Sequence, residues 1–206
     1  MDIDRSADVP RRPTLSDLMR LWFRWILDPA GTFLLRLGLA PNTITLAGLA
    51  GNFIAAIYLA SGNFLVGGLL VLAMGPVDAL DGTMARLRGE SSDWGAFVDS
   101  VSDRYSELFI LGGLVVRYLS TGDRLGAGLA FGAAAGSVLV SYAKARAESL
   151  GYEARGGILT RFERYLVLVP ALLLGFDRIG LGVITVLANL TALQRIWIVR
   201  RQARRR

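Results

Sequence analysis

The stretch PNTITLAGLAGNFIAAIYLA (residues 41–60) decides the fold class of this chain. It contains no charged residue over about the twenty positions that an α-helix needs to cross the hydrocarbon core of a bilayer. The whole chain has a similar character, since 53% of its 206 residues are hydrophobic and only 19% are charged. In soluble domains about a quarter of the residues are charged. The sequence therefore predicts an all-α integral membrane protein.

Five further apolar runs follow this stretch, so we predict six transmembrane helices. They cover residues 41–60, 64–80, 94–119, 125–150, 165–176 and 180–201. Six spans place both termini on one side of the membrane, and the arginines near both ends predict that this side is the cytoplasm. The connections 86–104 and 144–164 are expected there too, in a multi-pass protein of the cell membrane.

The segment before the first span, residues 15–39, mixes Leu, Trp and Phe with three arginines. This composition predicts an amphipathic helix on the membrane surface, interrupted near Pro29, with a soluble helix packed on a core as the alternative. The first dozen residues are polar, so we expect no cleavable signal peptide. The predicted organisation is a tail and juxtamembrane helix at 1–40, a six-helix domain at 41–201 and a basic tail at 202–206.

Four aspartates lie where the second and third apolar runs meet, in DALDGTMARLRGESSDWGAFVDSVSD (residues 78–103). On a helix, Asp78 and Asp81 share one face at i and i+3, and Asp99 and Asp103 share another at i and i+4. Carboxylates held together repel one another unless cations neutralise them, and acids at membrane depth are costly. The chain has no His and no Cys, so any metal here needs oxygen ligands, which favours Mg²⁺, Mn²⁺ or Ca²⁺.

This arrangement suits a diphosphate substrate, because Mg²⁺ bridges carboxylates and phosphate oxygens. Two metal ions can stabilise both the attacking and the leaving oxygen, and a carboxylate can remove a proton from a hydroxyl nucleophile. Carboxylate spacing alone leaves two other interpretations open: a proton or cation pathway in a transporter, and a buried structural ion site.

The complete pattern is D-x-x-D-G-x-x-A-R, eight residues, then G-x-x-x-D-x-x-x-D. It resembles the signature of the CDP-alcohol phosphatidyltransferase family at every fixed position. The resemblance implies metal binding by Asp78, Asp81, Asp99 and Asp103, with Asp103 also the general base. It implies CDP-lipid binding by Asn42, Thr43, Ile44, Thr45, Asp78, Gly82, Ala85, Arg86, Ser92 and Gly95. For Asn42 and Thr43, capping of the first spanning helix is the alternative.

Three short segments bear on the acceptor alcohol: SYAKARAE (141–148), RFER (161–164) and QR (194–195). Cations near a membrane boundary commonly snorkel to the headgroups, but together they can also form a phosphate-binding pocket. These segments look like those of prokaryotic phosphatidylinositol-phosphate synthases, apart from Phe162, where we expect proline. That resemblance implies an acceptor site of Ser141, Lys144, Arg146, Arg164 and Arg195.

The predicted reaction is transfer of the phosphatidyl group of CDP-diacylglycerol to inositol phosphate, giving phosphatidylinositol phosphate and CMP. Two ions of Mg²⁺ or Mn²⁺ are the expected cofactors, and the family precedent favours a homodimer. A phosphatidylglycerophosphate synthase, with glycerol phosphate as acceptor, is the second candidate. The alternative from another class is a cation-coupled transporter, although ion conduction does not need Gly82, Ala85 or Arg86. We interpret the net charge of +6 as contact with membrane lipids and expect no nucleic acid partner.

Overall fold

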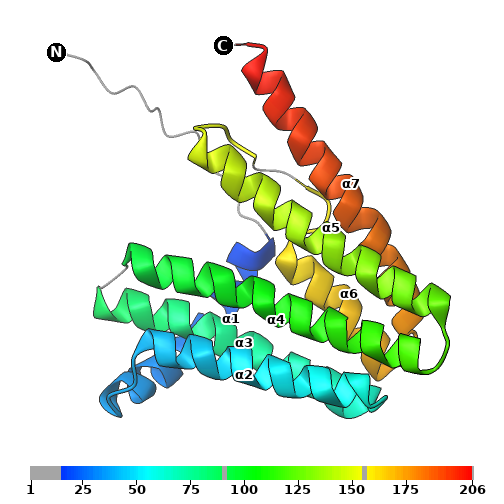
Figure 1. Ribbon diagram of the computed structural model, residues 1–206. Helices are drawn as coiled ribbons and strands as arrows, with labels where there is room; N and C mark the ends of the chain where they lie inside the picture. The colour runs from blue at the N-terminus through cyan, green and yellow to red at the C-terminus, as the bar shows by residue number, and fades with distance from the viewer. Residues whose placement is uncertain (1–14, 90–91, 155–156, 206) are drawn as a thin grey trace.

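The computed structural model describes residues 15–89, 92–154 and 157–205, and within them all regular structure is α-helical (Figure 1). This confirms the all-α prediction. The helices are α1 (Leu15–Arg36), α2 (Pro41–Ala60), α3 (Phe64–Arg88), α4 (Asp93–Ser120), α5 (Arg124–Ser149), α6 (Arg161–Leu173) and α7 (Asp177–Ala203). The predicted N-terminal tail up to residue 14 and the final residue of the basic tail lie outside the described residues.

Length and apolar composition suit four of the helices in the described part of the chain for crossing a bilayer, namely α2, α3, α5 and α7. The helix α4 is long enough but carries acidic residues, and α6 has only 13 residues, fewer than the roughly 20 that a span needs. The chain is therefore a multi-pass membrane protein, while the count of six spans stays a prediction.

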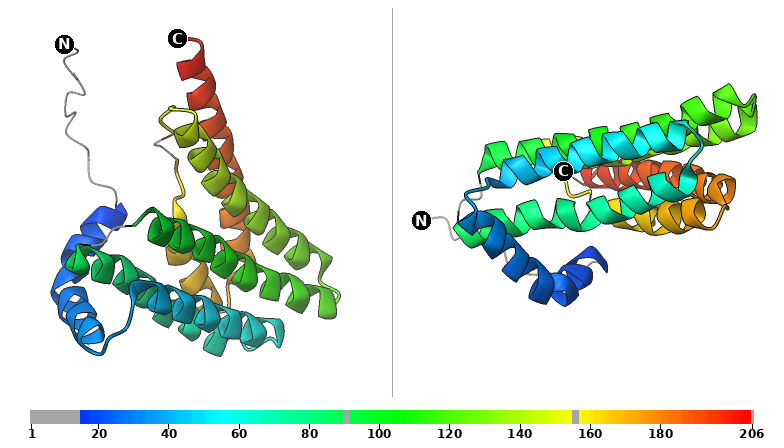
Figure 2. Two further views of the ribbon diagram at one scale, coloured as in Figure 1. Left: turned by 60° about the vertical axis from the view of Figure 1, so that its left-hand side comes forward. Right: turned by 90° about the horizontal axis from the view of Figure 1, so that it is seen from below.

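The spanning helices form two packed groups. Helix α2 packs against both α3 and α4, and α5 packs along α7. Figures 1 and 2 show α5 and α7 meeting the first group at one end of the molecule and diverging from it toward the other. Contacts of α4 with α5, and of α6 with both α3 and α7, join the two groups.

Helix α1 lies on the outside of this bundle, against α3. A Cβ placed on Gly31 would lie 3.3 to 3.5 Å from side-chain atoms of Thr83, Met84 and Leu87, so α1 packs beside the end of α3 that carries the acidic motif. The predicted interruption near Pro29 is wrong, because α1 continues through this residue as one helix. Proline has a helical φ and removes only one hydrogen-bond donor, which bends a helix more readily than it breaks it, and α1 is bent in Figure 2.

A short break between α3 and α4 divides the acidic motif between two helices. Helix α3 ends at Arg88 and is capped by Gly89, whose φ of 67° is left-handed and suits glycine. The Ser92 Oγ accepts a hydrogen bond from the Gly95 amide (3.0 Å) and so caps α4. Asp78 and Asp81 therefore lie toward the end of α3, and Asp99 and Asp103 lie in the first turns of α4.

Glycine allows the backbones of α2 and α4 to approach closely. A Cβ on Gly113 would lie 2.5 Å from the Ala56 carbonyl oxygen, which is backbone and cannot rotate away. The adjacent Gly112 has no such neighbour within 4 Å. Small residues at helix contacts are the usual basis of packing in a bilayer, where apolar burial between helices contributes little.

We expect Gly113→Ala to destabilise the protein by about 1–3 kcal/mol, since the added methyl group forces α2 and α4 apart. Gly112→Ala is the matched control, with the same chemical change one residue away in open space, and is expected to change the stability by less than about 0.5 kcal/mol. Thermal unfolding in detergent micelles measures both variants. Equal melting temperatures for the two would contradict this account of the α2–α4 contact.

Candidate active site

Asp78 is half-buried on α3 where α2 passes closest to it. A Cβ on Gly48 of α2 would lie 2.8 Å from the Asp78 Oδ1, so a larger residue at position 48 would collide with the carboxylate. Sequence reasoning did not single out Gly48. The only local sign of it was a small residue in an apolar helix, which occurs at many positions in this chain.

Asp81 is buried, and two hydrogen bonds hold its carboxylate. The Thr45 hydroxyl donates to Oδ2 over 2.6 Å, and the Gly82 amide donates to Oδ1 over 2.5 Å. Thr45 was predicted to contact the CDP-lipid, and here it orients an aspartate of the motif. The link joins α2 to α3 at the level of the acidic residues.

Asp99 and Asp103 complete the acidic group from α4. Asp99 lies close enough to interact electrostatically with Asp78, Asp81 and Asp103. The two helices thus bring the four predicted aspartates to one region of the bundle. The mutual repulsion of these carboxylates requires positive charge nearby.

Arg161, the first residue of α6, supplies part of that charge. Its Nη2 lies 2.7 Å from the Asp78 Oδ2 and its Nη1 lies 2.6 Å from the Asp103 Oδ1, so one guanidinium joins α3 and α4. The ring of Tyr165 lies 5.4 Å from the guanidinium carbon, within cation–π distance. We did not predict this role, because in the RFER segment only Arg164 matched the acceptor pattern.

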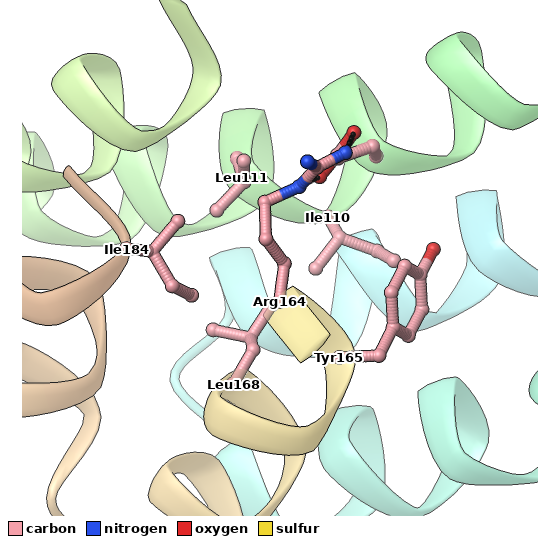
Figure 3. A pocket seen from close by; sticks show the side chains of 7 residues that line it. Ile110, Leu111, Arg164, Tyr165, Leu168 and Ile184 are labelled. Atoms are coloured by element: carbon pink, nitrogen blue, oxygen red, sulfur yellow. Dashed lines mark hydrogen bonds and ion pairs between the residues drawn. The ribbon is translucent and has the colours of Figure 1, made fainter. Parts of the chain in front are cut away.

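Arg164 is 2% exposed and forms a two-pronged ion pair with Glu107 of α4. The Nε and Nη2 lie 2.6 and 3.0 Å from the two carboxylate oxygens, and Nη1 donates to the Leu159 carbonyl over 3.3 Å. Figure 3 shows this guanidinium against the carboxylate above apolar side chains of three helices. The adjoining cavity of about 10 Å³ has room for about one water molecule. All of these contacts are with protein, and the predicted contact of Arg164 with an acceptor stays a prediction.

The residues predicted to bind the CDP-lipid line the end of α3 and the starts of α2 and α4. A Cβ on Gly82 would meet no atom within 4 Å, so its face of α3 is open. Arg86 folds back along its own helix, donating to the Gly82 carbonyl (3.2 Å) and the Thr83 hydroxyl (3.0 Å). Ala85 is half-buried one turn beyond Asp81, on the same part of α3.

The first turn of α2 meets the first turn of α4. A Cβ on Gly95 would lie 3.7 Å from the Asn42 Oδ1, which places Asn42 beside the start of α4. Helix α2 begins at Pro41 with Ala40 as its N-cap and no side-chain cap, so the capping alternative for Asn42 and Thr43 is wrong. Thr43 is exposed and Ile44 is buried. Ser92, which we predicted as a nucleotide contact, caps α4 in this structure.

The predicted acceptor residues differ widely in exposure. On α5, Lys144 and Arg146 are exposed and Ser141 is half-buried. The Lys144 Nζ lies 3.9 Å from the Glu148 Oε1, and the Arg146 Nη1 donates a hydrogen bond to the Ser149 Oγ over 3.4 Å. Arg195 is buried on α7 and donates to the Val140 carbonyl of α5 over 2.5 Å. Lys144, Arg146 and Ser141 therefore face a different environment from the buried Arg164 and Arg195.

The four motif aspartates are chemically suited to bind a divalent metal ion. Four carboxylates supply hard oxygen ligands, and the position of the Arg161 guanidinium shows that one cationic group reaches both Asp78 and Asp103. Among the described residues, however, no three acidic side chains are gathered tightly enough to form a complete ligand cluster. Asp81 turns toward Thr45, while Asp78 and Asp103 turn toward Arg161.

The sequence of residues 38–198 matches the family model of the CDP-alcohol phosphatidyltransferases. The chain belongs to this family. The acidic motif and its flanking glycines thus lie inside the matched region, and membership decides against a cation-coupled transporter. The chain is an enzyme of phosphatidyl transfer.

Proteins named phosphatidylinositol phosphate synthase resemble the chain over most of its length. The phosphatidylinositol phosphate synthase of Streptomyces avermitilis is 37% identical over 205 residues, covering 92% of this chain and 84% of its own. The phosphatidylinositol phosphate synthase of Mycobacterium tuberculosis, solved with CDP-DAG bound, has a TM-score of 0.80 at 28% identity, covering 84% of this chain and 93% of its own. Its complex with manganese and citrate has a TM-score of 0.76.

Proposed function

We propose that this enzyme transfers the phosphatidyl group of CDP-diacylglycerol to a hydroxyl of inositol phosphate, giving phosphatidylinositol phosphate and CMP. The observation that carries the proposal is that the Arg161 guanidinium reaches both Asp78 of α3 and Asp103 of α4, so the two halves of the acidic motif lie near each other, with the face of α3 open at Gly82. Relatives that are 33–37% identical and named phosphatidylinositol phosphate synthase support the choice of acceptor.

Asp78, Asp81, Asp99 and Asp103 would hold two divalent ions, Mg²⁺ or Mn²⁺. When bound, such ions neutralise the diphosphate of the donor and stabilise the charge that develops on the departing CMP. The hydrogen bonds from Thr45 and Gly82 orient the Asp81 carboxylate. Gly48 gives Asp78 the space that a Cβ would fill.

Asp103 is the group that we assign to the acceptor hydroxyl. In this proposal its carboxylate accepts the proton while the hydroxyl oxygen attacks the phosphorus of the phosphatidyl group, and the bond to CMP breaks. Gly82 and Ala85 leave room for the nucleotide along α3. Arg86, Ser92, Gly95 and the segment Asn42, Thr43, Ile44 and Thr45 would contact the CDP-lipid.

The acceptor phosphate would be bound by Ser141, Lys144, Arg146, Arg164 and Arg195. The exposed Lys144 and Arg146 supply positive charge at the end of α5, and the buried Arg195 ties this end of α5 to α7. Arginine suits two-pronged phosphate binding and lysine supplies a point charge. A phosphorylated acceptor needs such a cluster, whereas an uncharged alcohol does not.

The proposal includes six spans, α2 to α7, in a domain of residues 41–201, with both termini and the active site in the cytoplasm of a cell-membrane enzyme. Helix α6 is shorter than a full span, but Arg161 in its first turn contacts Asp78 of α3 and Asp103 of α4, so α6 begins at the depth of these acids. Residues 1–40 would form a tail and an interfacial helix, with α1 packed beside the acidic end of α3. Residues 202–206 would form a basic tail, and two copies would associate as a homodimer.

Release of CMP by the purified protein tests the function directly. We expect release with CDP-diacylglycerol, Mg²⁺ or Mn²⁺, and inositol phosphate, and no release with inositol or serine in place of inositol phosphate. Glycerol phosphate is supplied in a separate reaction, because its use would identify a phosphatidylglycerophosphate synthase. An ether-linked CDP-lipid tests the donor in the same way. No release with any acceptor would contradict the proposal.

A further inference from the structure

We propose that Arg161 is an internal counter-ion that competes with divalent metal for Asp78 and Asp103, so that metal loading displaces its guanidinium. The inference rests on the metal site of the proposed function and adds a residue that controls how that site is filled. Arg161 lies outside the D-x-x-D-G to D-x-x-x-D motif by more than 50 positions and comes from a different helix.

The geometry places one cation on two predicted metal ligands. The terminal nitrogens of Arg161 lie 2.7 Å from the Asp78 Oδ2 and 2.6 Å from the Asp103 Oδ1. The Asp78 contact is a charge-assisted hydrogen bond, a class about twice as strong as neutral ones, and the Asp103 contact is a close ion pair. The oxygens that the guanidinium engages are therefore withdrawn from any other cation.

The remaining contacts of Arg161 hold its guanidinium less firmly. Its Nε is buried and has no hydrogen-bond partner in the part of the chain that the structure describes, and the ring of Tyr165 lies 5.4 Å from the guanidinium carbon. Arg164, one turn further along α6, differs in this respect, since its two-pronged pair with Glu107 is reinforced by the Leu159 carbonyl. Displacing the Arg161 guanidinium therefore breaks fewer hydrogen bonds than displacing that of Arg164.

Its position on α6 also permits displacement. Arg161 is the first residue of the helix, and the capping box between Thr160 and Glu163 fixes the start of α6 independently of the Arg161 side chain. The Arg161 side chain as a whole is 31% exposed, so protein does not enclose it on every side. Moving it breaks no helical backbone hydrogen bond.

Electrostatics makes the competition reciprocal. Without a cation the four carboxylates repel one another, and the guanidinium relieves part of this repulsion. A metal ion bound by the same carboxylates repels the guanidinium, so each weakens binding of the other by the same factor. Arg161 therefore keeps the acidic group assembled before metal binds and lowers the apparent metal affinity.

The experiment is a Mn²⁺ titration of full-length wild type, Arg161→Gln and Arg178→Gln in detergent without substrates, by calorimetry and by the electron paramagnetic resonance signal of free Mn²⁺. Arg178→Gln is the matched control, since Arg178 pairs with Asp123 (2.7 Å) outside the acidic group. We expect Arg161→Gln to bind Mn²⁺ about tenfold more tightly than wild type. Arg178→Gln should match wild type.

Thermal unfolding provides the second readout. Arg161→Gln should melt below wild type in EDTA and at the same temperature at saturating Mn²⁺, because metal then replaces the lost charge. If Arg161→Gln does not fold, Arg161→Lys replaces it in the titration. A single ammonium group cannot bridge both carboxylates as the guanidinium does. The Arg161→Lys variant should therefore bind Mn²⁺ about threefold more tightly than wild type.

The outcomes separate this inference from the proposed function. Unchanged or weaker Mn²⁺ binding by the Arg161 variants, with normal binding by wild type, would overturn the competition and leave the metal site in place. A wild type that binds no Mn²⁺ would overturn both the metal role of the aspartates and the role of Arg161. Tighter binding in the variants with CMP release by wild type would support both.

Discussion

Replacing Asp103 by Asn is expected to lower the rate of CMP release by at least about 10³-fold while leaving CDP-diacylglycerol bound. The amide has nearly the same shape as the carboxylate, so the fold should persist. It cannot accept the proton of the acceptor hydroxyl, and it would weaken the proposed metal site. The measurement combines CMP release at saturating inositol phosphate with equilibrium binding of the CDP-lipid.

Asp93→Asn is the matched control for Asp103→Asn. Asp93 is exposed in the first turn of the same helix α4, has no assigned role, and undergoes the same change from acid to amide. We expect its turnover to stay within about twofold of wild type, since surface substitutions usually have small effects. Turnover near the wild-type rate in Asp103→Asn would remove Asp103 as the base.

The second large effect that we expect is a loss of stability when the buried ion pair of Arg164 and Glu107 is broken. Arg164→Ala and Glu107→Gln are each expected to lower the free energy of unfolding by about 3–5 kcal/mol, because each leaves a buried group without its partner. Both side chains are nearly inaccessible, at 2% and 8% exposure. Unfolding in mixed micelles with increasing SDS gives the comparison.

Two further variants test whether the pair acts through burial. Lys144→Gln changes an exposed cation whose nearest acidic partner is 3.9 Å away, so its stability should change by less than about 1 kcal/mol. Replacing both partners, as Glu107→Leu with Arg164→Leu, should recover most of the loss, since no charge is then left unpaired. A stable Arg164→Ala variant with a raised KM for inositol phosphate would instead support the predicted acceptor contact.

The helical architecture and the location of the acidic group were predictable from local patterns. Apolar runs of bilayer length indicate helices whatever their neighbours are, and the spacing of Asp78, Asp81, Asp99 and Asp103 places each pair on one helix face. Gly89 and Ser92 mark the break between the two pairs through preferences that act within a few residues. The sequence by itself thus determined an all-α membrane enzyme with two acidic helix faces.

Only the tertiary structure decided which residues complete and surround that acidic group. Arg161 reaches Asp78 across 83 positions, Arg164 reaches Glu107 across 57, and Thr45 reaches Asp81 across 36. No periodicity or spacing encodes such pairs, because they depend on how far each helix slides and rotates against its neighbours. For the same reason the two arginines of RFER look alike in sequence, although one bridges two aspartates of the motif and the other is buried against a glutamate. Helix packing, at contacts such as Gly48 beside Asp78, makes that distinction.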